Sequence, residues 1–173
     1  MTSRICCWLV LSCSLVLPSS RVLLGATPPA ADLSGTWRVD VARSSETAAS
    51  LDPAGPPPPP PPPGGVWQTL SPETIAQSGA ALTIQVGTGP VLKLALDGRQ
   101  SLNTAADGTV HRSTSRWEGN KLVTKWTLET GTDVRAQGTD VRWLEDGGRV
   151  LVNDRTRRTR WMEITYHIVW VRQ

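Results

Sequence analysis

The sequence predicts an all-β fold: an antiparallel up-and-down meander that closes into a β-barrel of about 8 to 10 strands. Two observations carry this prediction. Apolar and polar residues alternate with period two in short runs, and turns that contain glycine separate the runs. Glycine supplies the positive φ that tight hairpin turns require, so successive strands become antiparallel neighbours. A two-sheet sandwich is the alternative, but sandwiches carry longer crossing connections than these turns, and closure removes exposed edges.

The first 31 residues have the pattern of a secretory signal peptide. Arg4 precedes an apolar run at 5–17, and Pro18 then interrupts it. The run is shorter than the stretch of about 20 apolar residues that a membrane-spanning helix needs. We therefore expect a secreted or periplasmic protein that has no stable membrane insertion once the leader is removed.

Cysteine usage and charge restrict the function of the remaining chain. Cys6, Cys7 and Cys13 are the three cysteines, and all lie in the leader. The mature protein therefore has no disulfide, cysteine nucleophile or thiolate metal site. Two of the 18 basic residues, Arg4 and Arg21, also lie in the leader, which leaves 16 against 15 acidic residues. Such a balance lacks the basic excess of nucleic-acid-binding proteins, so we expect no nucleic acid as partner.

The chain from 32 to 173 has the length of one domain, and it opens with the segment Leu33–Val41. Gly35 lets the backbone turn tightly into the first strand, and Trp37 falls on the same face two residues later. The residues from Ala42 to Leu51 are expected to form at most a short helical turn before Pro53.

A proline-rich loop is predicted at residues 53–65. Pro56–Pro63 are eight consecutive prolines, and such a run adopts the stiff polyproline II conformation. Prolines have no N–H donor, so this segment is unsuited to a central strand ladder. One interpretation is a rigid surface spacer. The other is a docking segment for a partner protein with an aromatic groove.

Ten strands are predicted, each bounded by a turn or by proline. Leu82, Ile84 and Val86 illustrate the pattern, because they alternate with Thr83 and Gln85. The expected strands lie near residues 34–42, 67–77, 82–87, 91–96, 100–104, 109–117, 121–129, 134–144, 149–156 and 160–171.

Two short motifs resemble known β-barrel families. Gly35-x-Trp37 on the opening strand resembles the lipocalin signature. The segment Trp117–Val123 is similar to the tryptophan-glycine-lysine hairpin of fatty-acid-binding proteins; both families belong to the calycin group. Leu33–Ser44 also resembles the start of small, uncharacterised exported bacterial proteins with lipocalin-like domains. The resemblance implies a ligand-holding barrel in which Arg172 packs across Trp37, so Gly35, Trp37 and Arg172 form the barrel closure.

The interior face can be read from strand alternation. Leu122, Thr124, Trp126 and Leu128 share one face of a strand, and on the last strand Met162, Ile164, Tyr166, Ile168 and Trp170 form the apolar face. Seven tryptophans and no phenylalanine follow the leader, and they either fill the core or line a pocket. If there is a pocket, the predicted ligand-lining residues are Trp126, Leu128, Tyr166 and Ile168.

The residue inventory favours a non-catalytic protein. His111 and His167 are the two histidines, and their spacing builds no metal site. His167 with Asp154 or Glu163 is the basis of a weaker enzymatic hypothesis. We expect no catalytic residue, no metal and no cofactor. The basic cluster of Arg155, Arg157, Arg158 and Arg160 is interpreted as a solvated hairpin end, with contact to an anionic ligand as the alternative.

The sequence leaves two candidate functions. The first is an exported lipocalin-like β-barrel that binds a small apolar ligand. The alternative is a non-catalytic envelope scaffold or interaction protein that reaches its partner with the proline-rich loop. The interior volume discriminates between them, since a cavity of several hundred Å³ favours binding and a packed core favours the scaffold.

Overall fold

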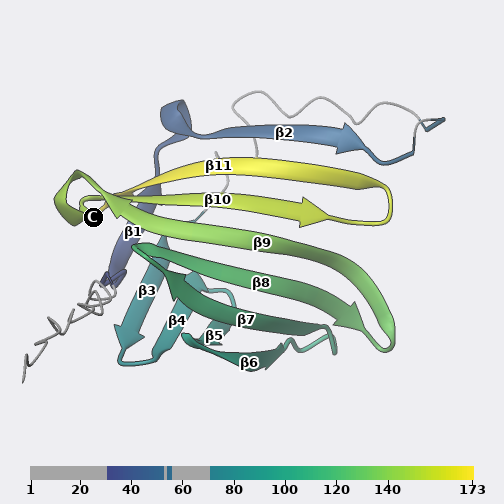
Figure 1. Cartoon of the computed structure of the whole chain (residues 1–173), viewed down its shortest axis with the longest axis horizontal. Helices are drawn as coiled ribbons and strands as arrows, with labels where there is room; N and C mark the ends of the chain where they lie inside the picture. Colours follow the sequence, from purple (N-terminus) through teal and green to yellow (C-terminus); the bar gives the residue numbers. More distant parts are fainter. Residues whose placement is uncertain (1–30, 53, 56–70) are drawn as a thin grey trace, which may run out of the picture.

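One antiparallel sheet wraps round on itself to form a nearly closed barrel (Figure 1). The computed structural model describes residues 31–52, 54–55 and 71–173, and within them the sheet has 11 strands. The prediction of an all-β meander barrel is confirmed. None of the helical segments in these ranges has the length and apolar character needed to traverse a bilayer.

The bounds of the strands are β1 Gly35–Val39, β2 Ser45–Ser50, β3 Glu73–Ser78, β4 Ala81–Val86, β5 Val91–Ala95, β6 Asp97–Thr104, β7 Val110–Glu118, β8 Lys121–Thr130, β9 Asp133–Glu145, β10 Val150–Arg158 and β11 Met162–Arg172. Short connections join the strands from β3 to β11, whereas β2 and β3 are separated by residues 51–72. In the part of the chain that the structure describes, the single-turn 3-10 helices η1 at Val41–Arg43 and η3 at Asp146–Gly148 lie between strands.

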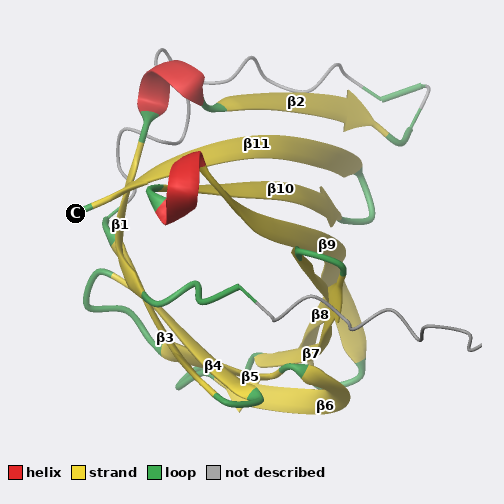
Figure 2. Cartoon of the chain, turned by 60° about the vertical axis from the view of Figure 1, so that its left-hand side comes forward, coloured by secondary structure: helices red, strands yellow, loops and turns green. Residues whose placement is uncertain are grey.

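The opening strand joins the two halves of the sheet. β1 pairs with β11 through Trp37 and Arg172, and with β3 through Gly35 and Ile75. The first and last strands therefore meet, as the meander predicts, and Figure 2 shows the sheet curling round from β11 through β8 to β3.

The ends of the sheet, β5 and β6, meet through side chains. The backbone N–H of Lys93 donates to Asn103 Oδ1 at 2.7 Å, and Asn103 Nδ2 donates to the Lys93 carbonyl at 2.9 Å. The Ala95 N–H donates to Ser101 Oγ at 2.8 Å. These side chains replace a regular ladder, so the barrel is bridged at this seam.

The sequence predicts at most a short helical turn within residues 42–51 and misses a strand there. η1 supplies one turn, and β2 then pairs with β11 from Ser45↔His167 to Ser50↔Met162. The small alternating side chains of β2 suit a sheet surface, and pairing gives its backbone N–H and C=O groups partners that a short exposed helix would lack.

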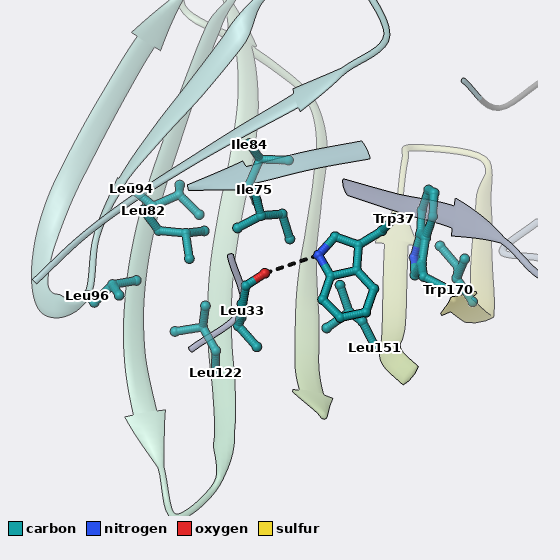
Figure 3. Packing of buried hydrophobic residues seen from close by; sticks show 11 residues of the cluster. Leu33, Trp37, Ile75, Leu82, Ile84, Leu94, Leu96, Leu122, Leu151 and Trp170 are labelled. Carbon is teal, nitrogen blue, oxygen red and sulfur yellow. Dashed lines mark hydrogen bonds between the residues drawn. The ribbon is translucent and has the colours of Figure 1, made fainter. Parts of the chain in front are cut away.

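The larger of the two apolar clusters among the described residues fills one end of the barrel (Figure 3). Trp37 is fully buried there, and its indole Nε1 donates to the Leu33 carbonyl at 3.0 Å. The cluster comprises Leu33, Trp37, Ile75, Leu82, Ile84, Leu94, Leu96, Leu122, Leu151, Ile168 and Trp170.

Arg172 covers this end from outside. Its guanidinium carbon lies 4.4 Å from the centroid of the Trp37 ring, and its Nη1 donates to the Ser34 carbonyl at 2.7 Å. Gly35 makes the approach possible, because a Cβ at this residue, whose φ is +147°, would lie 2.7 Å from Arg172 Nη1. The three residues expected at the barrel closure thus lie together.

Some sequence predictions fall outside the described residues. Residues 1–30 of the leader do, as do Pro53 and 56–70, which hold most of the proline-rich loop and the start of the strand expected at 67–77. Within the described part of that strand, β3 begins at Glu73, directly after Pro72.

Candidate functional site

A cavity of about 620 Å³ lies inside the barrel beside the apolar cluster. Its lining changes in exposure from one side to the other. Glu73, Arg142 and Asn153 are buried, whereas Val86 and Arg157 are exposed. The cavity therefore has a buried deep end and a mouth near the β4–β5 turn. The lining residues are Glu73, Ile84, Val86, Gly89, Pro90, Leu92, His111, Trp126, Leu128, Asp140, Arg142, Asn153, Arg155, Arg157, Tyr166, Ile168 and Trp170.

Strand register places the polar lining residues in adjacent rows. Leu122, whose side chain is buried in the core, pairs with Arg142, which in turn pairs with Asn153. The next inward row contains Asp140 and Arg155. Since partners across a ladder point to the same face of the sheet, all four polar residues face inward.

Asp140 is the centre of a buried ionic cluster. Its carboxylate accepts from Arg155 Nε at 2.7 Å and from Arg155 Nη2 at 2.9 Å, and it lies 3.1 Å from Arg142 Nη1. Trp126 Nε1 also donates to it at 3.3 Å. Burial alone would raise the pKa of Asp140, but the two guanidinium groups outweigh it and lower the pKa to about 2. Asp140 is therefore ionised and holds both arginines in place.

Glu73 approaches the cluster from the opposite wall of the barrel. It is almost fully buried, and its Oε1 lies 4.0 Å from Arg142 Nε, too far for a hydrogen bond. Burial raises the pKa of Glu73, while Arg142 opposes this shift. The deep end of the cavity thus holds one carboxylate with several partners and a second carboxyl group that remains available for hydrogen bonding.

Unpartnered polar atoms gather in this cavity. Among the described residues, six buried side-chain atoms have no hydrogen-bond partner, and five belong to cavity-lining residues. An unsatisfied buried polar group costs about 1 to 3 kcal/mol, so such groups mark sites where a ligand gains by supplying partners. The five atoms are Glu73 Oε1, His111 Nδ1, Arg142 Nε, Asn153 Oδ1 and Trp170 Nε1.

The two histidines lie in different environments. His111 lines the cavity and stacks on Trp126 with ring centroids 5.9 Å apart, and burial lowers the pKa of its imidazole. His167 lies on the outer face, where its Nδ1 is 2.7 Å from Asp154 Oδ1. This exposed pair is separate from the cavity. Among the described residues, no group of three or more histidine, cysteine, aspartate or glutamate side chains is arranged to hold a metal ion.

The four residues predicted from the sequence as ligand-lining, Trp126, Leu128, Tyr166 and Ile168, all lie on the cavity wall. Their contact with a ligand stays a prediction. The polar deep end was missed, and on β9 the pattern Asp140-Val141-Arg142-Trp143 places the charged residues inside and the apolar ones outside. Pairing β9 with β8, whose inward face is evident from the sequence, would have revealed this inversion.

The interpretation of the basic cluster as a solvated hairpin end is wrong for Arg155. This side chain points inward and binds Asp140, because it shares a row with that residue across the β9–β10 ladder. Arg157 is exposed but lines the cavity mouth, while Arg158 lies on the other face and Arg160 packs over the Trp161 ring at 4.8 Å.

Gly138 permits Trp126 to lie against the barrel wall. A Cβ at Gly138 would overlap the Thr156 carbonyl oxygen and lie 2.6 Å from Trp126 Cζ2. We expect Gly138→Ala to lower the free energy of unfolding by about 1 to 3 kcal/mol, since the backbone or the indole must shift. Urea denaturation measures this, with the exposed neighbour Gln137→Ala as control. Equal stability of the two variants would contradict the close contact.

Comparisons with known proteins give little further information. No family model matches the sequence, and no curated protein matches it. Among solved structures, the chain is similar to one described as REP1-NXSQ fatty acid transporter, with 12% sequence identity and a TM-score of 0.48 over 82% of this chain and 96% of that chain. At this low similarity, we transfer no property from that protein to this chain.

Proposed function

We propose that this protein is an exported barrel that binds one small amphipathic molecule inside its cavity. The observation that carries the proposal is a cavity of about 620 Å³ with an apolar wall and a buried polar end. Ligand sites commonly have volumes of about 300 to 1,000 Å³, mostly apolar linings and a few polar groups that fix orientation. The volume favours binding over the scaffold function.

The apolar wall supplies affinity for a hydrocarbon body. Ile84, Leu92, Leu128 and Ile168 line the cavity together with the indole of Trp126. Removing apolar surface from water contributes about 25 cal/mol per Å². The buried arginine and carboxyl groups offer only polar contacts, so they determine which end of the molecule enters first.

Export is part of this proposal and rests on the leader. The apolar run after Arg4, ended by Pro18, supports secretion. N-terminal sequencing of the protein recovered from outside the cytoplasm tests it. A mature N-terminus near Ala26 to Asp32 is expected, and an intact N-terminus on cytoplasmic protein would contradict export.

Binding is tested by calorimetric titration with decanol, a probe with a polar end and a short hydrocarbon chain. We expect one molecule per protein, and at least tenfold weaker binding in Leu128→Trp, because the larger side chain occupies the cavity. Leu102→Trp is the matched control, since Leu102 is exposed on β6 and does not line the cavity.

Native mass spectrometry of protein purified from its own host provides a second test. A co-purifying molecule that disappears in Leu128→Trp supports the proposal. Absence of any co-purifying molecule, together with no binding of decanol, decanoate or other lipophiles, would overturn it.

A further inference from the structure

We infer that the polar end of the ligand is a hydroxyl group, held between Arg142 Nε and Glu73 Oε1, so the ligand class is a neutral alcohol with an apolar body. This inference rests on the proposed function. It concerns two side chains from opposite walls of the barrel, on β9 and β3, whose facing atoms have no hydrogen-bond partner among the described residues.

The distance between the two atoms suits a single bridging oxygen. Arg142 Nε and Glu73 Oε1 are 4.0 Å apart. An oxygen placed at a hydrogen-bond distance of about 2.8 Å from both would subtend an angle of about 90° between them. A hydroxyl group accepts from the guanidinium N–H and donates its own proton to the carboxylate. One atom with both capacities therefore satisfies both side chains.

When Glu73 is ionised, the charges around the site disfavour a ligand carboxylate. Arg142 and Arg155 are balanced by the carboxyl groups of Asp140 and Glu73, and Asp140 already binds both arginines. An anion entering beside Arg142 would lie next to Glu73 in a buried environment, where like charges repel strongly. The other titratable side chains that face this space are His111 on β7, Arg157 on β10 and Tyr166 on β11.

Protonation of Glu73 distinguishes the two ligand classes. A hydroxyl group fits either state of Glu73, because it donates to the carboxylate or accepts from the carboxylic acid. A carboxylate fits only the protonated state. Burial raises the pKa of Glu73, so deprotonation at rising pH selectively removes the state that accepts a carboxylate. Alcohol affinity is therefore expected to change little with pH, and carboxylate affinity to fall.

The test compares decanol with decanoate by calorimetric titration at pH 6.5 and pH 8.5, where decanoate is ionised. We expect decanol to bind at least tenfold more tightly than decanoate at pH 8.5, and this difference to shrink only where falling pH protonates Glu73. Tighter binding of decanoate at pH 8.5 would overturn the hydroxyl inference and leave the proposed function intact. Failure of both probes and of other lipophiles would instead count against the proposed function.

Glu73→Gln provides the second arm. The glutamine amide oxygen still accepts a hydrogen bond, but the negative charge is gone. The affinity for decanoate at pH 8.5 is therefore expected to rise at least tenfold, while the affinity for decanol changes by less than a few fold. Burial of the charged form of Glu73 opposes folding, so the variant is expected to remain folded. Glu163→Gln, with the same charge change outside the cavity, is the control. An unchanged decanol preference in folded Glu73→Gln would contradict the inference.

Discussion

Replacing Asp140 with asparagine is expected to lower the free energy of unfolding by about 3 to 5 kcal/mol at pH 7, because it leaves two arginines without their carboxylate. The side chain of Arg142 is only 3% exposed, and Asp140 lies within 3.1 Å of it. Asparagine has nearly the same size as aspartate, so the loss reports charge and hydrogen bonding. Urea denaturation followed by tryptophan fluorescence measures the change.

The same variant is expected to change the acid sensitivity of the protein. The pKa of Asp140 is about 2 in the folded protein against an ordinary value of 3.8. A depressed pKa contributes stability that is present above the unfolded value and is lost as pH falls toward the folded value. As the pH falls between these two pKa values, the free energy of unfolding of the wild type should decrease by about 2 kcal/mol, at about 1.36 kcal/mol per pKa unit. The variant has no carboxylate at this position, so it should show no such decrease.

Asp154→Asn is the control for this prediction. Asp154 is exposed and pairs with His167 on the outer face of the barrel. We expect its replacement to change stability by less than about 1 kcal/mol, as is usual for exposed ion pairs. Equal effects of the two substitutions at pH 7 would contradict the assignment of Asp140 as the centre of the buried cluster.

Replacing Trp37 with alanine is expected to cost about 3 to 5 kcal/mol, the usual range for a buried tryptophan. The indole is 0% exposed, it donates to the Leu33 carbonyl, and Arg172 covers its ring. Its loss opens a cavity in the apolar cluster at the strand that joins both halves of the sheet. Thermal and urea denaturation both measure the effect.

Two further substitutions separate the causes at this site. Trp37→Phe keeps most of the apolar area but removes the Nε1 donor, so it is expected to cost less than alanine. Trp161→Ala removes an indole that is 61% exposed and should change stability by about 0.5 kcal/mol or less. If Trp37→Ala were no more destabilising than Trp161→Ala, the role of Trp37 in the core would be refuted.

Local pattern predicts most of this fold because hairpins make chain neighbours into sheet neighbours within β3–β5 and within β6–β11, whereas β1 and β2 pair with strands far away in the sequence. The alternation in Leu82, Ile84 and Val86 and the intervening turns place β4 and its successors correctly. β2 escaped prediction because its residues, Ser45–Ser50, have no apolar alternation and depend on pairing with β11. That contact is long-range, so its cause lies more than a hundred residues away in the sequence.

Sequence patterns predict the apolar part of the candidate site but not its buried charged residues. The rule that apolar residues of a strand face the interior correctly places Trp126 and Ile168 on the cavity wall. It fails for Arg142 and Asp140, because buried charges follow the geometry of their partners and not hydrophobic periodicity. Glu73 lies on β3, far from β9 in the sequence, and only the closed barrel brings its Oε1 within 4.0 Å of Arg142 Nε.

The most direct test of the binding account is a crystal structure of the complex with decanol that carries bromine on its terminal carbon. Anomalous scattering locates the bromine independently of the hydroxyl group. We expect the ligand oxygen within about 3.2 Å of Arg142 Nε and Glu73 Oε1, and the bromine toward Val86 and Pro90 at the mouth of the cavity. Bromine beside Arg142, or a ligand bound only outside the barrel, would contradict it.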